Sequence, residues 1–390
     1  MSRPDLLARL AQAQAARAEA GLLRRLRGVD AVDGAYVLIG GRRLLNFASN
    51  DYLGLAQHPR LREALVDAAQ RWGVGATAAH LLGGHRAPHE ELEQALADWT
   101  GRERALLFSS GYLANIGVLV ALLRDGDLCL QDKLNHACLI DGARLSGATL
   151  KRYVHADVAS ARRQLDAMPD AAALLATDGV FSMDGDVAPL AELAVLCRAR
   201  GATLHVDDAH GLGVLGRDGA GSLAEAGLDQ DAAPVLMATL GKALGCAGAF
   251  IAGSANLIDG LVQFARSHVY TTAMPPAVAA AALVAVNIAR YESWRRDRLQ
   301  ILIAHLRDGA AARGLPLLPS RSAIQPLRVG DSETALRLSR ALEARGVYVP
   351  AIRPPTVPAG TARLRITLSA LHSEAMVEQL LDTVQAVQKT

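Results

Sequence analysis

The chain has 390 residues, 51% of them hydrophobic and 4% aromatic, and a formal net charge of +2. This length and composition are typical of a globular protein with two packed regions, and the nearly neutral charge with scattered arginines does not indicate a nucleic-acid partner. The four cysteines lack the paired spacing of a zinc site and the density of a secreted disulfide scaffold, so we expect free thiols, no bound metal and a cytoplasmic location. We expect neither a secretory signal nor a membrane segment, because the most apolar later stretch, residues 276–289, is too short to span a bilayer.

The order of the predicted elements favours an α/β protein. Residues 6–26 have apolar positions at helical spacing, and two short strands are predicted at 36–39 and 44–47. Beyond residue 49, apolar runs alternate with longer helical patterns, which predicts a mostly parallel sheet covered by helices, with strands at 105–108, 127–130, 174–177, 203–206, 235–238 and 249–251. The last part has predicted helices at 291–306 and 333–345, and strands at 323–329, 347–349 and 363–369.

These patterns divide the chain into three predicted parts. We expect an N-terminal helical arm with short strands over residues 1–48, and a large α/β domain over 49–286. A smaller α+β domain is expected over 287–390.

Polar residues follow five of the expected strands, at the point where each strand ends. In open α/β sheets ligands bind beyond the carboxyl ends of the strands, so we expect these residues to converge: Ser110, Gly111 and Tyr112; Asn135 and His136; Asp178 to Ser182; Asp207 and His210; Thr239 and Lys242. Residues 110–112 also begin a helical pattern, whose free N–H groups suit a phosphate. The sequence therefore predicts one ligand site beside a phosphate-binding helix end.

The predicted chemistry depends on Lys242. The chain has only four lysines, at positions 133, 151, 242 and 389, and Lys242 alone lies between glycines directly after an apolar run, where a cofactor can come close. A lysine and an acid at two strand ends are suited to pyridoxal 5'-phosphate (PLP): Lys242 links to the aldehyde and Asp207 keeps the pyridine nitrogen protonated. We also expect Lys242 to take the α-proton of an incoming amino acid. The alternative is a surface lysine on a turn.

Several neighbouring residues also have simpler interpretations. Asp208 faces away from Asp207 on a strand and could cap the next helix. His210 could be a satisfied buried histidine or could reach the phenolic oxygen of the cofactor. His136 is open to the same two kinds of interpretation, and as a site residue it would stack on the pyridine ring. Ser182 could be only a turn residue.

A glycine pattern offers a competing cofactor. Residues 211–216, GLGVLG, fit the spacing of a dinucleotide site. That motif requires an acid at the end of the next strand about twenty positions later, whereas Glu225 and Asp229 precede the next predicted strand. We therefore favour PLP over a dinucleotide.

Four motifs resemble those of the α-oxoamine synthases, a family of fold-type-I PLP enzymes. They are NFASNDYLGL (46–55), DGVFSMDGD (178–186), VDDAHG (206–211) and TLGK (239–242). The resemblance extends from residue 46 to the C-terminus and implies a homodimer with its site at the subunit interface. Within the family, residues 270–276 and 352–365 are most similar to members of biotin biosynthesis. Those members condense L-alanine with a pimeloyl thioester, carried by coenzyme A or acyl carrier protein, and release CO2.

This resemblance also implies roles for individual residues. Lys242 links to the cofactor, His136 stacks on its ring and Asp207 pairs with the pyridine nitrogen. The remaining cofactor contacts are to the phenolic oxygen (Ser182, His210), to the phosphate (Gly111, Tyr112, Thr239) and to the phosphate of the neighbouring subunit (Thr272). Substrate contacts are implied for Arg24, Asn50, His136, Thr356 and Arg365, with the planar fork of Arg365 binding the amino-acid carboxylate.

Two positions depart from the patterns of relatives. Asp178 stands where many relatives have glutamate, so we expect a water or a shifted backbone to make the same contact. Ala79 and Leu81 align where 5-aminolevulinate synthases have the threonine and asparagine that bind a succinyl carboxylate, which disfavours a short dicarboxylic acyl group.

Three alternative functions remain open. The chain could be a glycine C-acetyltransferase or another sibling synthase, an aminotransferase of the same fold, or a non-catalytic regulatory subunit such as occurs among serine palmitoyltransferases. The joint presence of Lys242, His136 and Asp207 argues against the last.

Overall fold

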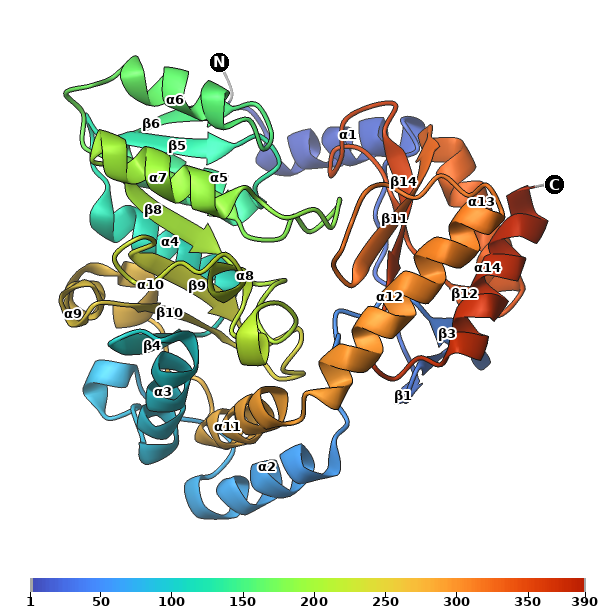
Figure 1. Cartoon of the computed structure of the whole chain (residues 1–390), viewed down its shortest axis with the longest axis horizontal. Coiled ribbons are helices and arrows are strands. Elements are labelled where there is room, and N and C mark those ends of the chain that lie inside the picture. Colours follow the sequence, from blue (N-terminus) through green and yellow to red (C-terminus); the bar gives the residue numbers. More distant parts are fainter. Residues whose placement is uncertain (1–2, 389–390) are drawn as a thin grey trace.

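The computed structural model describes residues 3–388. Lys389 lies outside that range. The largest sheet of the protein has seven strands in the order β4-β10-β9-β8-β7-β5-β6. Their bounds are β4 (Arg104–Phe108), β5 (Leu128–Asp132), β6 (Thr149–Tyr153), β7 (Ala173–Asp178), β8 (Thr203–Asp207), β9 (Val235–Thr239) and β10 (Ala249–Gly253). Strands β5 to β9 pair in parallel. The predicted mostly parallel α/β sheet is therefore confirmed (Figure 1).

Two strands of the seven-stranded sheet differ from the sequence prediction. Strand β10 was expected to be parallel, but it pairs antiparallel with both β4 and β9. The apolar pattern of a buried strand carries no information on its direction, which explains the error. Strand β6 was not predicted, because as an edge strand it is polar and partly exposed, with Thr149, Lys151 and Arg152 among its five residues.

The large sheet is buried on both faces. Alternate side chains of β10 point to opposite faces of the sheet and enter two different cores. Phe250 and Ala252 belong to one core, and Ala249 and Ile251 belong to the other. Helices α4 (Gly111–Leu122), α5 (Ala137–Ser146), α9 (Ala255–Phe264) and α10 (Arg266–Val269) pack on the side of Ile251. The opposite side is covered by α3 (Ala87–Thr100), α6 (Val158–Asp166), α7 (Leu190–Arg200) and α11 (Pro276–Tyr291), with α2 (Pro59–Trp72) packed on α11.

The N-terminal strands join the C-terminal part of the chain. β1 (Ala31–Asp33), β2 (Tyr36–Ile39) and β3 (Arg42–Asn46) form a sheet with β12 (Val347–Tyr348), which pairs in parallel with β3. A three-stranded sheet is formed by β11 (Ile324–Gly330), β14 (Ala362–Thr367) and β13 (Ala351–Ile352). Both lie to the right in Figure 1, beside helices α12 (Trp294–Ala312), α13 (Ser332–Ala344) and α14 (Glu374–Gln388).

The remaining elements are α1 (Leu6–Glu19), α8 (Ser222–Glu225) and two short 3-10 helices, η1 (His80–Leu82) and η2 (Arg217–Gly219). The expected boundary at residue 286 falls within α11, and the division into three parts stays a prediction. Within residues 3–388, no helix combines the length and apolar character needed to cross a membrane.

Candidate active site

The carboxyl ends of the central strands surround a cavity of about 200 Å³. Its lining contains nearly all the residues that the sequence assigned to a cofactor: Gly111, Tyr112, His136, Asp178, Ser182, Asp207, His210, Thr239 and Lys242. Thr272 is the exception. It is exposed and forms an isolated bridge with Ala79. Five segments that are far apart in the sequence thus meet at one edge of the sheet.

The helix α4 begins at this cavity. Ser110 caps it, and its side chain accepts from the backbone N–H of Leu113. Gly111 and Tyr112, the first residues of α4, line the cavity, where the free N–H groups of a helix N-terminus favour an anion. On the other side, the hydroxyl of Thr239 accepts from the N–H of Gly241 and donates to the carbonyl of Gly248.

Lys242 is one end of a buried hydrogen-bonded chain. Its Nζ lies 2.8 Å from Nε2 of His210, whose Nδ1 lies 2.5 Å from the hydroxyl of Tyr52. The Tyr52 hydroxyl donates to Oδ1 of Asn50, 3.2 Å away. Burial raises the pKa of Tyr52 to about 12, so the phenol keeps its proton. Because the amine donates to Nε2, the Nδ1–H of His210 donates to Tyr52. The order of donors therefore runs from the lysine to Asn50.

The same burial controls the protonation of Lys242 and His210. Burial lowers the pKa of Lys242, and the negative charge of Asp207 opposes this effect. Burial and the positive charge of Lys242 lower the pKa of His210 well below its usual value. The imidazole is therefore neutral and can accept from the amine.

Asp207 and Asp178 occupy paired positions on β8 and β7. Oδ2 of Asp207 accepts from Nδ2 of Asn115 at 2.7 Å, and Oδ1 accepts from the N–H of Ala209 at 3.1 Å. Asp178 accepts from the backbone N–H of His136 at 3.2 Å. Burial and the charge of Asp207 raise the pKa of Asp178 well above its usual value. The negative charge of Asp207 therefore disfavours a second negative charge on Asp178.

Asp208 lies on the other side of the strand. It is fully buried and accepts from the N–H of Ser222, the first residue of α8, at 2.7 Å. Burial raises its pKa to about 7. Gly211, the first glycine of the rejected nucleotide pattern, also belongs to this environment, because a Cβ there would lie 2.1 Å from Oδ1 of Asp208. Close packing on Asp208 thus explains why residue 211 is glycine.

The predicted substrate residues fall into two groups. Arg365, on β14, is buried, and its Nη1 and Nη2 both lie 3.2 Å from Oδ1 of Asn50 while its Nε donates to the carbonyl of Ser182. Within residues 3–388 it forms no ion pair with a carboxylate, so its charge is available to a ligand. Arg24 donates to the hydroxyl of Thr356 at 3.3 Å, at a different place.

Arg24 and Thr356 line a second cavity of about 930 Å³. It adjoins the first, since His136 and Ser182 belong to both. Apolar and cationic side chains mix in its wall, including Leu134, Ile140, Pro354, Pro355, Val357, Lys133, Arg152 and Arg363. The cation of Arg363 is paired with Asp184.

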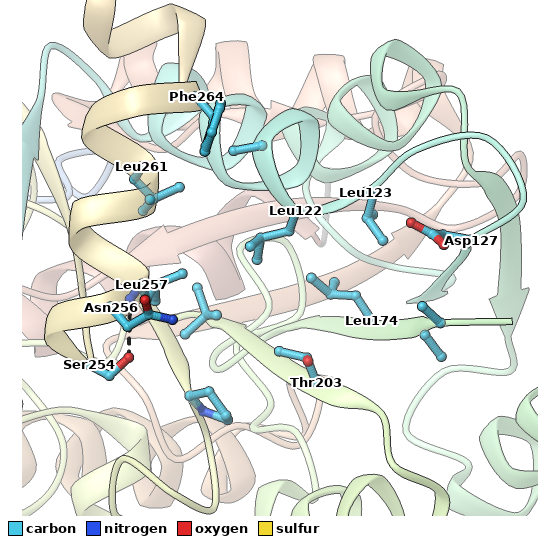
Figure 2. A pocket seen from close by; sticks show the side chains of 16 residues that line it. Leu122, Leu123, Asp127, Leu174, Thr203, Ser254, Asn256, Leu257, Leu261 and Phe264 are labelled. Atoms are coloured by element: carbon cyan, nitrogen blue, oxygen red, sulfur yellow. Dashed lines mark hydrogen bonds between the residues drawn. The ribbon is translucent and has the colours of Figure 1, made fainter.

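A third cavity, of about 440 Å³, lies at the opposite edge of the sheet. Figure 2 shows leucines of α4 and α9 together with Phe264 gathered around it, above Leu174 and Thr203 of the sheet. Asp127 is its single ionisable lining residue. It contains none of the residues predicted to carry chemistry.

Three residues near the first cavity had no assigned role in the sequence. They are Tyr52, which lies within the resemblance motif at 46–55, and Asn115 and Cys138. Tyr52 is hydrogen-bonded to His210, which contacts Lys242. Asn115 contacts Asp207 and Cys138, and Cys138 contacts His136. Asn115 and Cys138 lie within apolar helical patterns, and only the packing of α4 against α5 reveals them.

Comparison with known proteins identifies the family. A family model described as aminotransferase class I and II matches residues 42–384. An 8-amino-7-oxononanoate synthase of Pseudomonas putida is 55% identical over 97% of this chain and 96% of its own. Another, of Alkalilimnicola ehrlichii, is 56% identical over 95% of each chain. The chain belongs to the 8-amino-7-oxononanoate synthase family.

Solved structures agree with this assignment. The 8-amino-7-oxononanoate synthase of Francisella tularensis has a TM-score of 0.78 and 30% identity, covering 89% of this chain and 98% of its own. A serine palmitoyltransferase of S. paucimobilis, solved with bound PLP and myriocin, has a TM-score of 0.93 and 29% identity over 99% of both chains. The predicted fold-type-I architecture and the predicted family are therefore confirmed.

Proposed function

We propose that this protein is a PLP-dependent acyltransferase that condenses L-alanine with a pimeloyl thioester. The products are 8-amino-7-oxononanoate, CO2 and the free thiol carrier, as a step of biotin biosynthesis. The observation that carries the proposal is that Lys242, Asp207 and Arg365 converge beside a large second cavity, in a chain 55% identical to an 8-amino-7-oxononanoate synthase.

The first cavity fits PLP. It offers a buried lysine, two adjacent carboxyl groups and a helix N-terminus within a single space. We assign Lys242 to the aldehyde, Asp207 to the pyridine nitrogen, His136 to the ring face, and the other contacts to Gly111, Tyr112, Thr239, Asp178, Ser182 and His210. When bound, PLP supplies an electron sink for the carbanion formed at the α-carbon of the amino acid.

Lys242 is suited to move the α-proton. Its lowered pKa increases the fraction of neutral amine near neutral pH, and a neutral Nζ can accept a proton. His210 accepts from the same amine and, through Tyr52, fixes its direction. The chain from Lys242 to Asn50 thus orients the base without supplying a competing charge.

Arg365 is suited to bind the carboxylate of L-alanine. A guanidinium offers two parallel N–H donors that match a carboxylate. Its Nε is anchored on Ser182 and its Nη atoms contact a neutral amide, so a carboxylate can bind without displacing an anion. Asn50 accepts hydrogen bonds from both Arg365 and Tyr52. It therefore links the substrate-binding arginine to the hydrogen-bonded residues that orient Lys242.

The second cavity is suited to the acyl thioester. Its apolar wall suits a methylene chain, while Arg24, Lys133 and Arg152 form no ion pair within residues 3–388 and can bind anionic groups. Such groups are present on the pimeloyl carboxylate and on the phosphates of either carrier. Arg24 and Thr356 are the residues we assign to this substrate, together with His136 at the junction of the two cavities.

We further propose that two copies form a homodimer in the cytoplasm. Thr272 does not reach the cavity of its own chain, and its exposure leaves it free to reach the phosphate site of a neighbour. The division into residues 1–48, 49–286 and 287–390 belongs to the same proposal.

The test is a product assay with the PLP-loaded protein. We expect L-alanine with pimeloyl-CoA or pimeloyl-acyl carrier protein to yield 8-amino-7-oxononanoate by mass, and Lys242→Ala to abolish turnover while leaving a folded protein. Lys151→Ala, on the edge strand β6, is the matched control and should turn over normally. Turnover only with glycine and acetyl-CoA would assign the chain to a sibling synthase. Pyruvate formed from L-alanine when a 2-oxo acid is added as amino-group acceptor would indicate an aminotransferase. Normal turnover by Lys242→Ala would exclude the proposed mechanism.

A further inference from the structure

Two buried side chains at the first cavity connect Asp207 to His136, one of which, Cys138, also lines it. They are Asn115 of α4 and Cys138 of α5, whose side chains are essentially inaccessible to solvent. Nδ2 of Asn115 lies 2.7 Å from Oδ2 of Asp207 and 3.0 Å from Sγ of Cys138. Sγ of Cys138 lies 2.9 Å from Nδ1 of His136. The four residues form one continuous set of contacts.

The orientation of the Asn115 amide follows from its neighbours. An ionised carboxylate can only accept, so the amide must present Nδ2 to Asp207. Its two hydrogens are then used by Asp207 and by the sulfur of Cys138. The amide oxygen is left buried without a hydrogen-bond partner among the described residues, which is a cost that the charged contact offsets.

The proton position on His136 follows in the same way. The backbone N–H of Cys138 donates to Nδ1 of His136 at 3.4 Å, in the capping arrangement at the start of α5. A backbone N–H can only donate, so Nδ1 carries a lone pair and the imidazole proton of the neutral ring is on Nε2.

The thiol supplies a second donor to the same atom. Burial and the negative charge of Asp207 raise the pKa of Cys138, so the side chain remains a thiol with its hydrogen. Its sulfur accepts from Asn115, and its S–H can donate to Nδ1 of His136. An Nδ1–H tautomer would lose the hydrogen bond from the backbone N–H of Cys138 and could donate to the sulfur, which is only a weak acceptor.

We propose that Asn115 and Cys138 are positioning residues that hold His136 as its Nε2–H tautomer. They leave Nε2–H as the single donor that the ring offers to a ligand acceptor. The role of His136 as a substrate contact rests on the proposed function, whereas the assignment of its tautomer does not. Asn115 also restrains Asp207, so one pair of residues orients both the acid and the ring at the cofactor site.

The direct test is 15N NMR of histidine side chains in the full chain without substrate, with His136 assigned by His136→Gln. The wild type should show the Nε2–H tautomer. Cys138→Ser, which keeps a donor, should preserve it, and Cys138→Ala should add a fraction of the Nδ1–H tautomer. Cys197→Ala removes a buried free thiol from α7, on the opposite side of the sheet, and is the matched control.

Kinetics provide a second readout. Loss of one hydrogen bond corresponds to a factor of about ten or less, so Cys138→Ala should raise KM for L-alanine up to about tenfold, with kcat nearly unchanged and with recovery in Cys138→Ser. An Nδ1–H tautomer in the wild type would overturn the proposal. So would a Cys138→Ala variant that matches Cys197→Ala in both tautomer and KM. Absence of synthase activity with an intact NMR result would refute the proposed function and leave the tautomer assignment standing.

Discussion

Arg365→Lys is the substitution that most sharply probes the substrate site. Lysine keeps the positive charge but loses the planar fork, so one of two hydrogen bonds to the alanine carboxylate is lost. A charge-assisted hydrogen bond contributes about 1.5–3 kcal/mol, which corresponds to a rise in KM for L-alanine of roughly tenfold to a hundredfold. The anchor of Arg365 on the carbonyl of Ser182 is also removed, so the side chain is less well oriented.

The assay is the initial rate at varied L-alanine and saturating pimeloyl thioester. Arg363→Lys is the matched control, because Arg363 lies two residues earlier on the same strand and is paired with Asp184. We expect that variant to leave KM for L-alanine within about twofold, because the guanidinium of Arg363 contacts Asp184 and the carbonyl of Met183 and does not share the contacts of Arg365 with Asn50. An unchanged KM in Arg365→Lys, or equal effects in both variants, would refute the assignment of Arg365 to the carboxylate.

Three further predictions concern other parts of the molecule. Tyr52→Phe removes the hydroxyl that orients His210, so kcat should fall about fivefold to tenfold with little change in KM; steady-state rates equal to the wild type would contradict this. Lys133→Glu reverses a charge at the second cavity and should raise KM for the acyl thioester more at low than at high salt; an effect that does not depend on salt would count against an anion site. Burial would lower the pKa of His155, but hydrogen bonds and charges from Asp132 and Asp186 outweigh it and raise the pKa to about 10. The contribution of His155 to stability is therefore complete below about pH 6.5 and is lost as pH rises through 10. In urea titrations at pH 6, His155→Gln should lower the free energy of unfolding by about 1–2 kcal/mol, after allowance for solvent screening. A stability deficit of the variant that persists above pH 10 would contradict the ion-pair account.

The sequence predicts those parts of the site that strand ends place together. A parallel sheet brings its carboxyl ends to one edge, so Asp178, Asp207 and Lys242 could be grouped without coordinates. Contacts between faces of different helices have no such regularity. Asn115 lies five residues inside α4 and Cys138 is the second residue of α5, and their meeting depends on how the two helices pack.

The direction of strands is similarly hidden in the sequence. Buried strands have continuous apolar runs whether they are parallel or antiparallel, which is why the antiparallel pairing of β10 was missed. The polar edge strand β6 shows the converse problem, because exposure removes the apolar signal. The contact of Thr272 with the phosphate of a second subunit remains a prediction, because a single chain cannot contain that contact.

The central claim is decarboxylative condensation, and isotope labelling tests it most directly. The PLP-loaded protein would be supplied with L-alanine carrying 13C in its carboxyl group, together with a pimeloyl thioester. The account predicts that the label leaves as 13CO2 in equal amount with unlabelled 8-amino-7-oxononanoate. Retention of the label in pyruvate or in the acylated product would contradict it.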